Sequence, residues 1–173
     1  TKTDGSVVTW GQGDAGSPSG MSTLLSSGVT DISGGDYAFA ALKGDGSVVT
    51  WGSESWGGDS SSVETELSAG VTSVSHSRNA FAALESDGSV VTWGMSGHGG
   101  NSWSVSASLQ SQVVEISAND TSFAALKSDG SVVTWGQAND GGDSSLVSAS
   151  LSGGVKDIVA HNGGYAALEA DGS

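Results

Sequence analysis

The sequence contains no cysteine, a single proline and only five lysine or arginine residues among its 173. Without cysteine there is no disulfide bond and no thiolate chemistry. The five basic residues are outnumbered by 19 acidic ones, so the formal net charge is −14 and a nucleic acid backbone would be repelled. No apolar run approaches the roughly 20 residues of a membrane-spanning helix. We therefore expect no nucleic acid partner and no membrane insertion.

Glycine and serine are abundant instead, and they recur in register with valine, leucine, alanine and tryptophan. The octapeptide Asp-Gly-Ser-Val-Val-Thr-Trp-Gly occurs four times without change, at residues 4–11, 45–52, 87–94 and 129–136. It recurs once after 41 residues and then every 42, and a fifth copy begins at Asp171. A fixed period of this length is typical of repeat proteins, whose stacked units share a core. The sequence divides into units at about 1–41, 42–83, 84–125 and 126–167, with 168–173 starting a fifth copy.

Each repeat contains three segments with the composition of short β-strands. In one copy these are residues 71–75, 80–84 and 89–93. The last two are joined across Asp87-Gly88, a dipeptide that predicts a two-residue hairpin with a type I′ turn. The strands lack a clean alternation of apolar and polar residues, so we expect both faces of each sheet to be buried. The segment before the first strand carries apolar residues at fixed offsets and is expected to form a short fourth strand or an ordered crossover.

Three or four short antiparallel strands with both faces covered describe a β-propeller blade. We therefore predict an all-β fold with about four blades per chain. A β-solenoid is the alternative, and the tight hairpins favour the propeller. The recurring turn glycines and tryptophans are predicted to be structural positions: Gly46, Gly88, Gly130, Trp10, Trp51, Trp93 and Trp135.

One complete repeat consists of Gly28–Gly35, Phe39–Leu42, Asp45–Val48 and Thr50–Gly52. In this order the segments resemble a repeat of the regulator of chromosome condensation family, and the resemblance covers all four units. The short unit is similar to that of bacterial members such as the propeller-type β-lactamase inhibitor protein. The resemblance implies a propeller fold, although family propellers typically have seven blades. The family's nucleotide-exchange activity rests on features outside the repeat core and is not implied here.

The repeat register divides one unit between the two ends of the sequence. Residues 6–10 have the sequence of a third strand for the unit that stops at Ser173. The chain can close a four-bladed ring by pairing its ends, two chains can share an eight-bladed ring, or the chain can belong to a longer array. Each of these arrangements would cover the unpaired strand edges, which are otherwise prone to aggregation. We rank the larger assembly or the array above the closed monomer.

The units differ most in two sets of loops, which follow the first strand and the Trp-Gly pair. Loops vary because few packing constraints act on them, and binding residues concentrate in loops for the same reason. The side chains in them that most often anchor a protein partner are Tyr37, Trp56, Arg78, His98 and Trp103. An exposed tryptophan also suits a sugar-binding surface.

Catalytic and metal-binding patterns are lacking. His76, His98 and His161 occupy different repeat positions, and no zinc-like spacing occurs. The turn at residues 139–143 has a calcium-site composition, but without the 12-residue loop pattern we interpret it as a solvated turn. No nucleophile elbow, Walker loop or dinucleotide fingerprint is present. We predict no enzymatic activity, no cofactor and no bound metal.

Together these features predict a non-enzymatic module that binds a protein partner through its variable inter-strand loops. Self-association into a larger ring is a further expectation. A structural spacer or adhesin-like segment of a large repetitive surface protein is the alternative, and a carbohydrate-binding lectin is the third. The acidic, cysteine-free composition favours an extracellular or cell-surface location.

Overall fold

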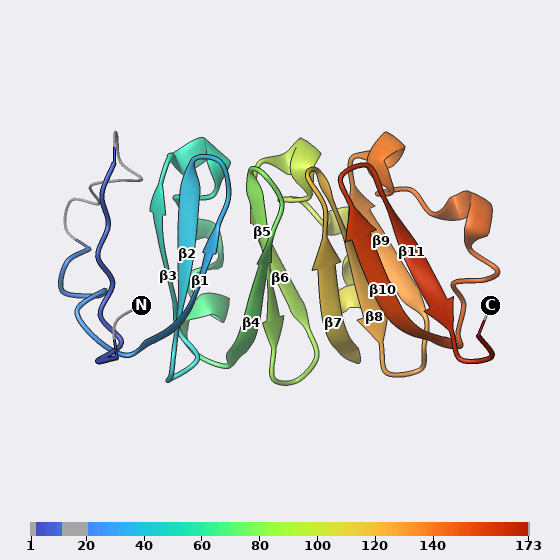
Figure 1. Ribbon diagram of the computed structural model, residues 1–173, viewed down its shortest axis with the longest axis horizontal. Helices are drawn as coiled ribbons and strands as arrows, with labels where there is room; N and C mark the ends of the chain where they lie inside the picture. Colours follow the sequence, from blue (N-terminus) through green and yellow to red (C-terminus); the bar gives the residue numbers. More distant parts are fainter. Residues whose placement is uncertain (1–2, 12–20, 173) are drawn as a thin grey trace.

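The computed structural model describes residues 3–11 and 21–172. Within these residues the chain forms eleven β-strands in four separate antiparallel sheets, which lie side by side in chain order (Figure 1). The first three sheets have three strands each, and the fourth has two. The strands are β1 Val29–Gly34, β2 Ala38–Lys43, β3 Val48–Gly52, β4 Val71–His76, β5 Ala80–Glu85, β6 Val90–Gly94, β7 Val113–Ala118, β8 Ser122–Lys127, β9 Val132–Gly136, β10 Val155–His161 and β11 Gly164–Glu169.

The expected crossovers are present, and they are short 3₁₀ helices rather than fourth strands. These helices are η1 Glu54–Trp56, η2 Ser61–Val63, η3 Glu66–Ser68, η4 Ser96–His98, η5 Trp103–Leu109, η6 Ala138–Asp140 and η7 Ser145–Val147. Leu25, Leu67 and Leu109 of the crossovers lie in the core and are only 2–3% exposed, whereas Leu151 at the same repeat position is half-buried. Since the sheets are built from hairpins and remain separate, the arrangement is that of propeller blades and not of a solenoid.

The core lies between the blades. Ala38, Ala40 and Leu42 on β2 form one apolar cluster with Phe81 and Trp93 of the next sheet. A second cluster repeats this packing between the second and third sheets. The alanines of β2, β5 and β8 are at most 1% exposed, so both faces of the middle strands are buried as expected. Small side chains at these positions allow neighbouring sheets to approach closely.

In each of the first three blades, a stacked aromatic pair connects the middle strand to the outer strand. Phe81 stacks on Trp93 with ring centroids 5.3 Å apart, and the indole Nε1 of Trp93 donates a hydrogen bond of 3.1 Å to the carbonyl oxygen of Gly57. Gly57 lies in the loop that leaves the preceding blade, and its φ is +100°. A Cβ atom there would lie 2.6 Å from the Phe81 ring, so only glycine fits.

The hairpin turns differ from the sequence-based expectation. Lys43 N donates to Ser47 O at 2.8 Å and Gly46 N donates to Lys43 O at 2.9 Å, which closes a three-residue loop. Gly46 has a φ of +81°. Gln112 is the one non-glycine residue with positive φ in the described ranges, so Asp45 lacks the positive φ that the first central residue of a type I′ turn requires. The type I′ prediction is therefore wrong for Asp45 and its equivalents, and the turn is a type I turn with a glycine bulge. The Asp45 carboxylate accepts hydrogen bonds from the hydroxyl and amide of Ser47, which lower its pKa.

Neighbouring blades are linked at their first strands by serine hydroxyls. Ser33 donates to Val74 O at 2.6 Å, Ser75 to Ile116 O at 3.0 Å, and Ser117 to Ile158 O at 3.0 Å. The equivalent position on β10 is Val159, which cannot donate a hydrogen bond and is 62% exposed. The fourth blade thus differs from the others at the contact that a following blade would use.

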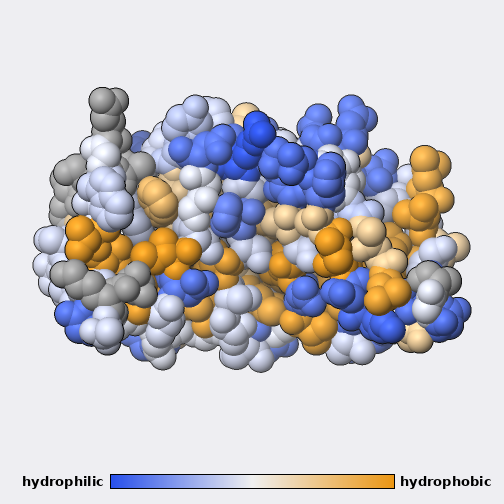
Figure 2. All heavy atoms as spheres, in the orientation of Figure 1, coloured by the Kyte–Doolittle hydropathy of each residue, from blue (hydrophilic) through white to orange (hydrophobic). Residues whose placement is uncertain are grey.

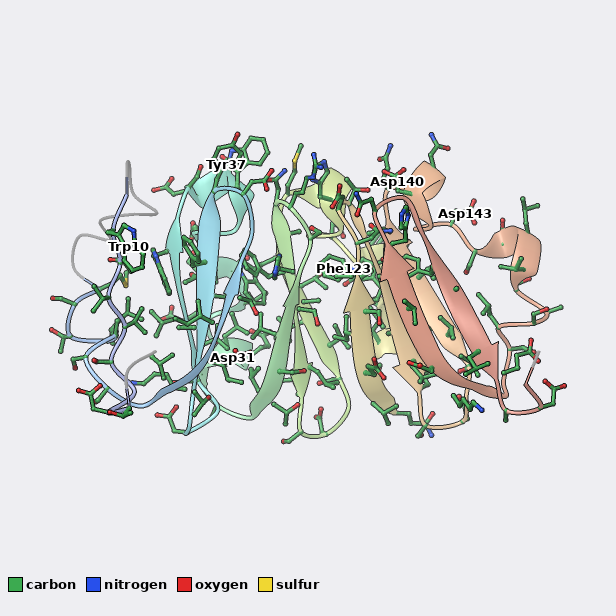
Figure 3. All side chains as sticks on the ribbon, in the orientation of Figure 1. Trp10, Asp31, Tyr37, Phe123, Asp140 and Asp143 are labelled. Carbon is green, nitrogen blue, oxygen red and sulfur yellow. The ribbon has the colours of Figure 1, made fainter. Side chains whose placement is uncertain are left out.

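The described chain forms an open row of blades. Residues 7–10 lie beside the first sheet, at the opposite end of the molecule from β11 (Figures 1 and 3). Within one chain the structure does not pair these residues with β11, so the four-bladed ring closed by terminal pairing is not formed here.

Candidate functional site on the loop face

One end of the blades carries most of the variable loops. We call it the loop face and define it by the strand connections 35–37, 77–79, 119–121 and 162–163, together with η1, η4 and η6. Tyr37 and Asp140 lie at this end of the molecule, opposite the Asp-Gly hairpins (Figure 3). Figure 2 shows that hydrophilic side chains gather along the same edge.

A polar depression of about 420 Å³ opens on the loop face between all four blades. Its charged and titratable side chains come from the ends of the first strands and from the short connections that follow them. They are Asp36, His76, Arg78, Asp120 and His161, with Asn162 beside them. Asp36, Arg78, Asp120 and Asn162 occupy one repeat position, so a single register supplies carboxylate, guanidinium and amide groups to one concave surface.

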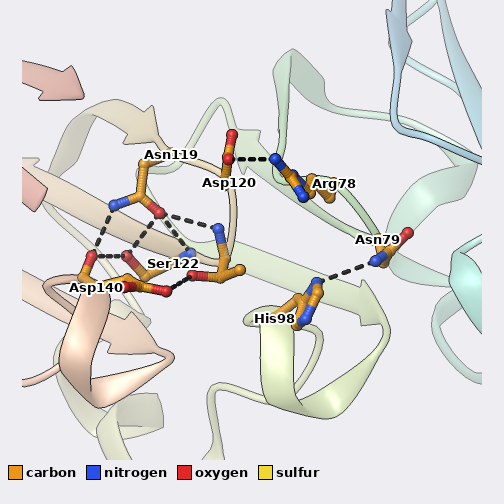
Figure 4. A network of polar contacts seen from close by, with 8 residues as sticks. Arg78, Asn79, His98, Asn119, Asp120, Ser122 and Asp140 are labelled. Atoms are coloured by element: carbon orange, nitrogen blue, oxygen red, sulfur yellow. Dashed lines mark hydrogen bonds and ion pairs between the residues drawn. The ribbon is translucent and has the colours of Figure 1, made fainter. Parts of the chain in front are cut away.

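Hydrogen bonds between blades hold the first three connections together. Asp36 N donates to Arg78 O at 2.7 Å, and Arg78 N donates to Asp120 O at 2.9 Å. The guanidinium of Arg78 also pairs with the carboxylate of Asp120 at 2.7 Å (Figure 4). Gly35 permits this approach, because a Cβ atom there would lie 2.5 Å from Arg78 O. The depression is therefore a fixed surface in which the backbone is preorganised.

The variable loop residues form matched pairs in each of the first three blades. In the first blade the rings of Tyr37 and Trp56 lie 5.0 Å apart. At the same two positions in the second blade, Asn79 Nδ2 lies 3.1 Å from His98 Nδ1. In the third blade, the Thr121 hydroxyl donates to an Asp140 carboxylate oxygen at 2.6 Å. Aromatic–aromatic, amide–imidazole and hydroxyl–carboxylate contacts thus replace one another at the same two repeat positions on a constant scaffold.

The third blade has the densest of these polar networks. The Asn119 side-chain oxygen accepts hydrogen bonds from Thr121 N, Ser122 N and the Ser122 hydroxyl, while its amide nitrogen donates to Asp140 O (Figure 4). The Ser122 hydroxyl also contacts the Tyr165 hydroxyl at 3.1 Å. Burial raises the pKa of Tyr165 to about 12, so this phenol remains protonated at neutral pH. The network thus connects the loops of the third blade to strand β11 of the fourth blade.

The five candidate contact residues are not equally placed. Tyr37 and Arg78 are each about half exposed on the loop face, and Trp56 and His98 are half-buried beneath its surface. Trp103 begins η5 and is 84% exposed, and no contact in the described residues joins its ring to the other four. Sequence reasoning missed Asp36, Asn79, Asp120, Thr121 and Asp140. Their repeat positions, shared with Arg78, Tyr37 and His98, were the signal that could have identified them.

The tryptophans at the recurring repeat position also differ in exposure. Trp51, Trp93 and Trp135 are 2–4% exposed, whereas Trp10 is 83% exposed. Gly46, Gly88 and Gly130 all have positive φ in their turns.

The acidic turn at residues 139–143 uses its carboxylates within the protein. Asp140 accepts from Thr121, and Asp143 accepts from Ser145 N at 2.9 Å, which lowers the pKa of Asp143. In the part of the chain that the structure describes, no three histidine, aspartate or glutamate side chains gather as a metal-binding group. No helix in the described ranges is long and apolar enough to cross a membrane.

No protein-family model and no curated protein matches the sequence. Solved structures do match the fold. Prp20p from Saccharomyces cerevisiae, the yeast RCC1 protein, aligns over 83% of this chain and 43% of its own, with 19% identity and a TM-score of 0.57. The ectodomain of the Physcomitrella patens receptor kinase CR4 aligns over 83% and 39%, with 16% identity and a TM-score of 0.53. The CRINKLY WD40 ectodomain of Arabidopsis thaliana ACR4 aligns over 83% and 49%, with 17% identity and a TM-score of 0.53.

The fold is an RCC1-like β-propeller. The match covers less than half of each of these three chains. The resemblance seen in the repeat sequence is confirmed at the level of the fold. The similarity to bacterial inhibitor proteins stays a prediction.

Proposed function

We propose that the chain is a non-enzymatic protein-interaction module that binds its partner through the loop face. The observation that carries this proposal is the set of matched pairs, in which the loop residues vary together while the blade core stays constant. A constant frame with fixed, varied loops is the arrangement on which binding surfaces are commonly built.

The similar structures support a protein partner by analogy. Prp20p was solved with a study of its binding to Gsp1p and histones, and two other neighbours are receptor kinase ectodomains. Fold similarity at these identities carries no specific partner to this chain.

Charge narrows the class of partner. The chain carries a net charge of −14, and the one basic side chain in the depression, Arg78, is already paired with Asp120. Asp36 is exposed at the same rim. A basic protein surface therefore fits this face, and a nucleic acid does not. A location outside the cell or on its surface belongs to the same proposal.

The test is affinity capture from an extract of the source organism, with matched variants as bait. Tyr37→Ala/Arg78→Ala removes two exposed loop-face side chains. Asp129→Asn alters a hairpin turn at the opposite end and retains the side-chain oxygen that accepts from Ser131. We expect one partner to bind the unmodified chain and Asp129→Asn equally, and to be lost with the double variant. The double variant should still unfold cooperatively, at a slightly lower midpoint because it lacks the Tyr37–Trp56 contact and the Arg78–Asp120 ion pair. Equal capture by all three baits would contradict the proposal. Elution by free sugar, with loss in Trp103→Ala, would support a lectin instead.

A further inference from the structure

The first blade carries two aromatic rings on the loop face where the next two blades carry polar groups. The rings of Tyr37 and Trp56 lie 5.0 Å apart, and their planes are tilted by 53°. Tyr37 is 54% exposed at the loop end of the blade (Figure 3), and Trp56 is half-buried beside it. The second and third blades have these residues at the same two positions: Asn79 and His98, then Thr121 and Asp140. Of the three complete blades, only the first thus presents aromatic faces here.

Backbone hydrogen bonds hold the two loops of this aromatic pair together. Ser53 N donates to Tyr37 O at 2.9 Å, which joins the loop after β3 to the connection between β1 and β2. Trp56 N and Gly58 N then both donate to Ser53 O, at 3.1 and 2.9 Å. The corresponding bonds recur in the second and third blades. The two rings are therefore carried by a fixed frame, and a ligand would not have to order these loops.

Two exposed carboxylates accompany the aromatic pair. Asp36 directly precedes Tyr37, and Glu54 lies two residues before Trp56 in η1. The second and third blades have neutral residues at the position of Glu54. The first blade alone thus combines two acidic residues with two aromatic rings in these loops.

The basic residue of the neighbouring connection is already occupied. The guanidinium of Arg78 pairs with the carboxylate of Asp120 at 2.7 Å, on the side of the third blade. Only the carbonyl oxygen of Arg78 is hydrogen-bonded to the first blade, where it accepts from Asp36 N at 2.7 Å. Within the residues that the structure describes, neither Asp36 nor Glu54 forms an ion pair. Their charge is therefore available to a partner.

We propose that Tyr37 and Trp56, with Asp36 and Glu54 beside them, bind a lysine or arginine side chain of the protein partner. Aromatic faces attract cations through the ring quadrupole, and the two carboxylates add direct charge attraction. The net charge of −14 draws a basic surface toward the chain. This inference rests on the proposed protein-binding function of the loop face and names the contact that anchors the partner there.

The first experiment is a titration with a tetralysine peptide, followed by NMR of the tryptophan indole N–H signals. The salt concentration is held at about 150 mM, where the Debye length of about 8 Å suppresses diffuse attraction to the acidic chain. We expect the indole signal of Trp56 to shift with saturation. Uniform small shifts of all tryptophans, or none at Trp56, would overturn the proposal.

The decisive variant is Tyr37→Asn/Trp56→His, which gives the first blade the pair that the second blade carries. Tetralysine binding should weaken by about 2- to 30-fold, since the aromatic faces are lost while both carboxylates remain. Trp103→Ala is the matched control, because it removes a tryptophan that is 84% exposed outside the loop face, and it should bind as the unmodified chain does. Equal weakening by the two variants would contradict the proposed contact.

A second variant keeps the test valid if the aromatic exchange disturbs folding. Asp36→Asn/Glu54→Gln changes only exposed side chains and leaves both rings in place. It should weaken tetralysine binding by about 2- to 5-fold. Unchanged affinity would show that these carboxylates do not contribute to cation binding.

Methylation of the peptide separates the aromatic contact from a purely ionic one. A trimethylated lysine retains its positive charge and its attraction to an aromatic face but cannot donate a hydrogen bond to a carboxylate. We expect the peptide of trimethyllysines to bind the unmodified chain at least as tightly as tetralysine. Loss of binding on methylation would refute the role of the rings.

The captured partner distinguishes this inference from the proposed function. If the partner is lost with both Tyr37→Ala/Arg78→Ala and Tyr37→Asn/Trp56→His, both proposals are supported. If it is lost only with the first of these variants, the loop face binds the partner but the aromatic pair does not anchor it. If it is retained by both variants, both proposals fail.

Discussion

The charge at position 85 gives a sharp test of the repeat frame. Glu85 ends β5, and the equivalent residues of the first and third blades are Lys43 and Lys127. One Glu85 carboxyl oxygen is buried without a hydrogen-bond partner, although the residue as a whole is half-exposed. Burial raises the pKa of Glu85, and the neighbouring carboxylates of Asp87 and Glu66 raise it further. In the sister blades, hydrogen bonds from Ser47 and Ser131 lower the pKa of the turn aspartates Asp45 and Asp129, and the lysines at this position lower it further.

Glu85→Lys is therefore expected to stabilise the protein at neutral pH. It removes two repulsions between like charges and places a cation beside Asp87. Solvent screens each contribution because the residue is half-exposed, so the expected gain in the free energy of unfolding is about 0.5–1 kcal/mol. For a chain of this length that corresponds to a rise of about 1–4 °C in the melting temperature.

Glu85→Gln separates the two contributions and fixes the sign of the pH dependence. A raised pKa in the folded state means that ionisation of Glu85 costs stability, and this cost develops as the pH rises through that pKa. Below the unperturbed value of 4.5 the group is protonated in both states, and the cost disappears. Urea unfolding should show Glu85→Gln more stable than the unmodified chain at pH 7, with the difference vanishing below pH 4.5. A destabilised Glu85→Lys at pH 7, or a benefit of Gln that grows in acid, would refute the reasoning.

Three other substitutions test the packing between and within blades. Gly57→Ala should lower the free energy of unfolding by about 2–5 kcal/mol, because the new methyl group overlaps the Phe81 ring and the backbone has positive φ. An unchanged midpoint of urea unfolding would disprove this contact. Gln112→Gly should stabilise by up to about 1 kcal/mol, since Gln112 has a φ of +69° where other repeats have glycine; thermal unfolding measures the gain, and a loss would show that its side chain contributes more than the strain. Ser75→Ala should cost about 1 kcal/mol by removing the hydroxyl that donates to Ile116 O; calorimetry that shows no change would argue against a role for this link in stability.

The strands were predictable because their signal is local and is repeated. Segments 71–75, 80–84 and 89–93 were expected, and β4, β5 and β6 match them closely. The turn type was not predictable in the same way. Asp-Gly fits both a two-residue and a three-residue hairpin, and the choice depends on whether Lys43 or a later residue begins the loop. That depends on the pairing of the whole strand, which a dipeptide does not encode.

The candidate site was predictable only in part. Variation between units located the loops. From these loops we selected side chains that often anchor a protein partner, such as Tyr37 and Arg78. The pairs Asn79–His98 and Thr121–Asp140 escaped because their members are 19 residues apart and join different loops. The exposure of Trp10 could not be predicted from the sequence. Its sequence context is identical to that of three buried tryptophans, and its exposure depends on which strands lie beside it.

The loop face as a binding surface is the central claim, and hydrogen–deuterium exchange of the chain alone and with its captured partner tests it most directly. The account predicts that binding slows exchange in the connections 35–37, 77–79 and 119–121, while the hairpin turns at 45–46, 87–88 and 129–130 keep their rates. Protection confined to those turns, or to the segment around Trp103, would contradict it.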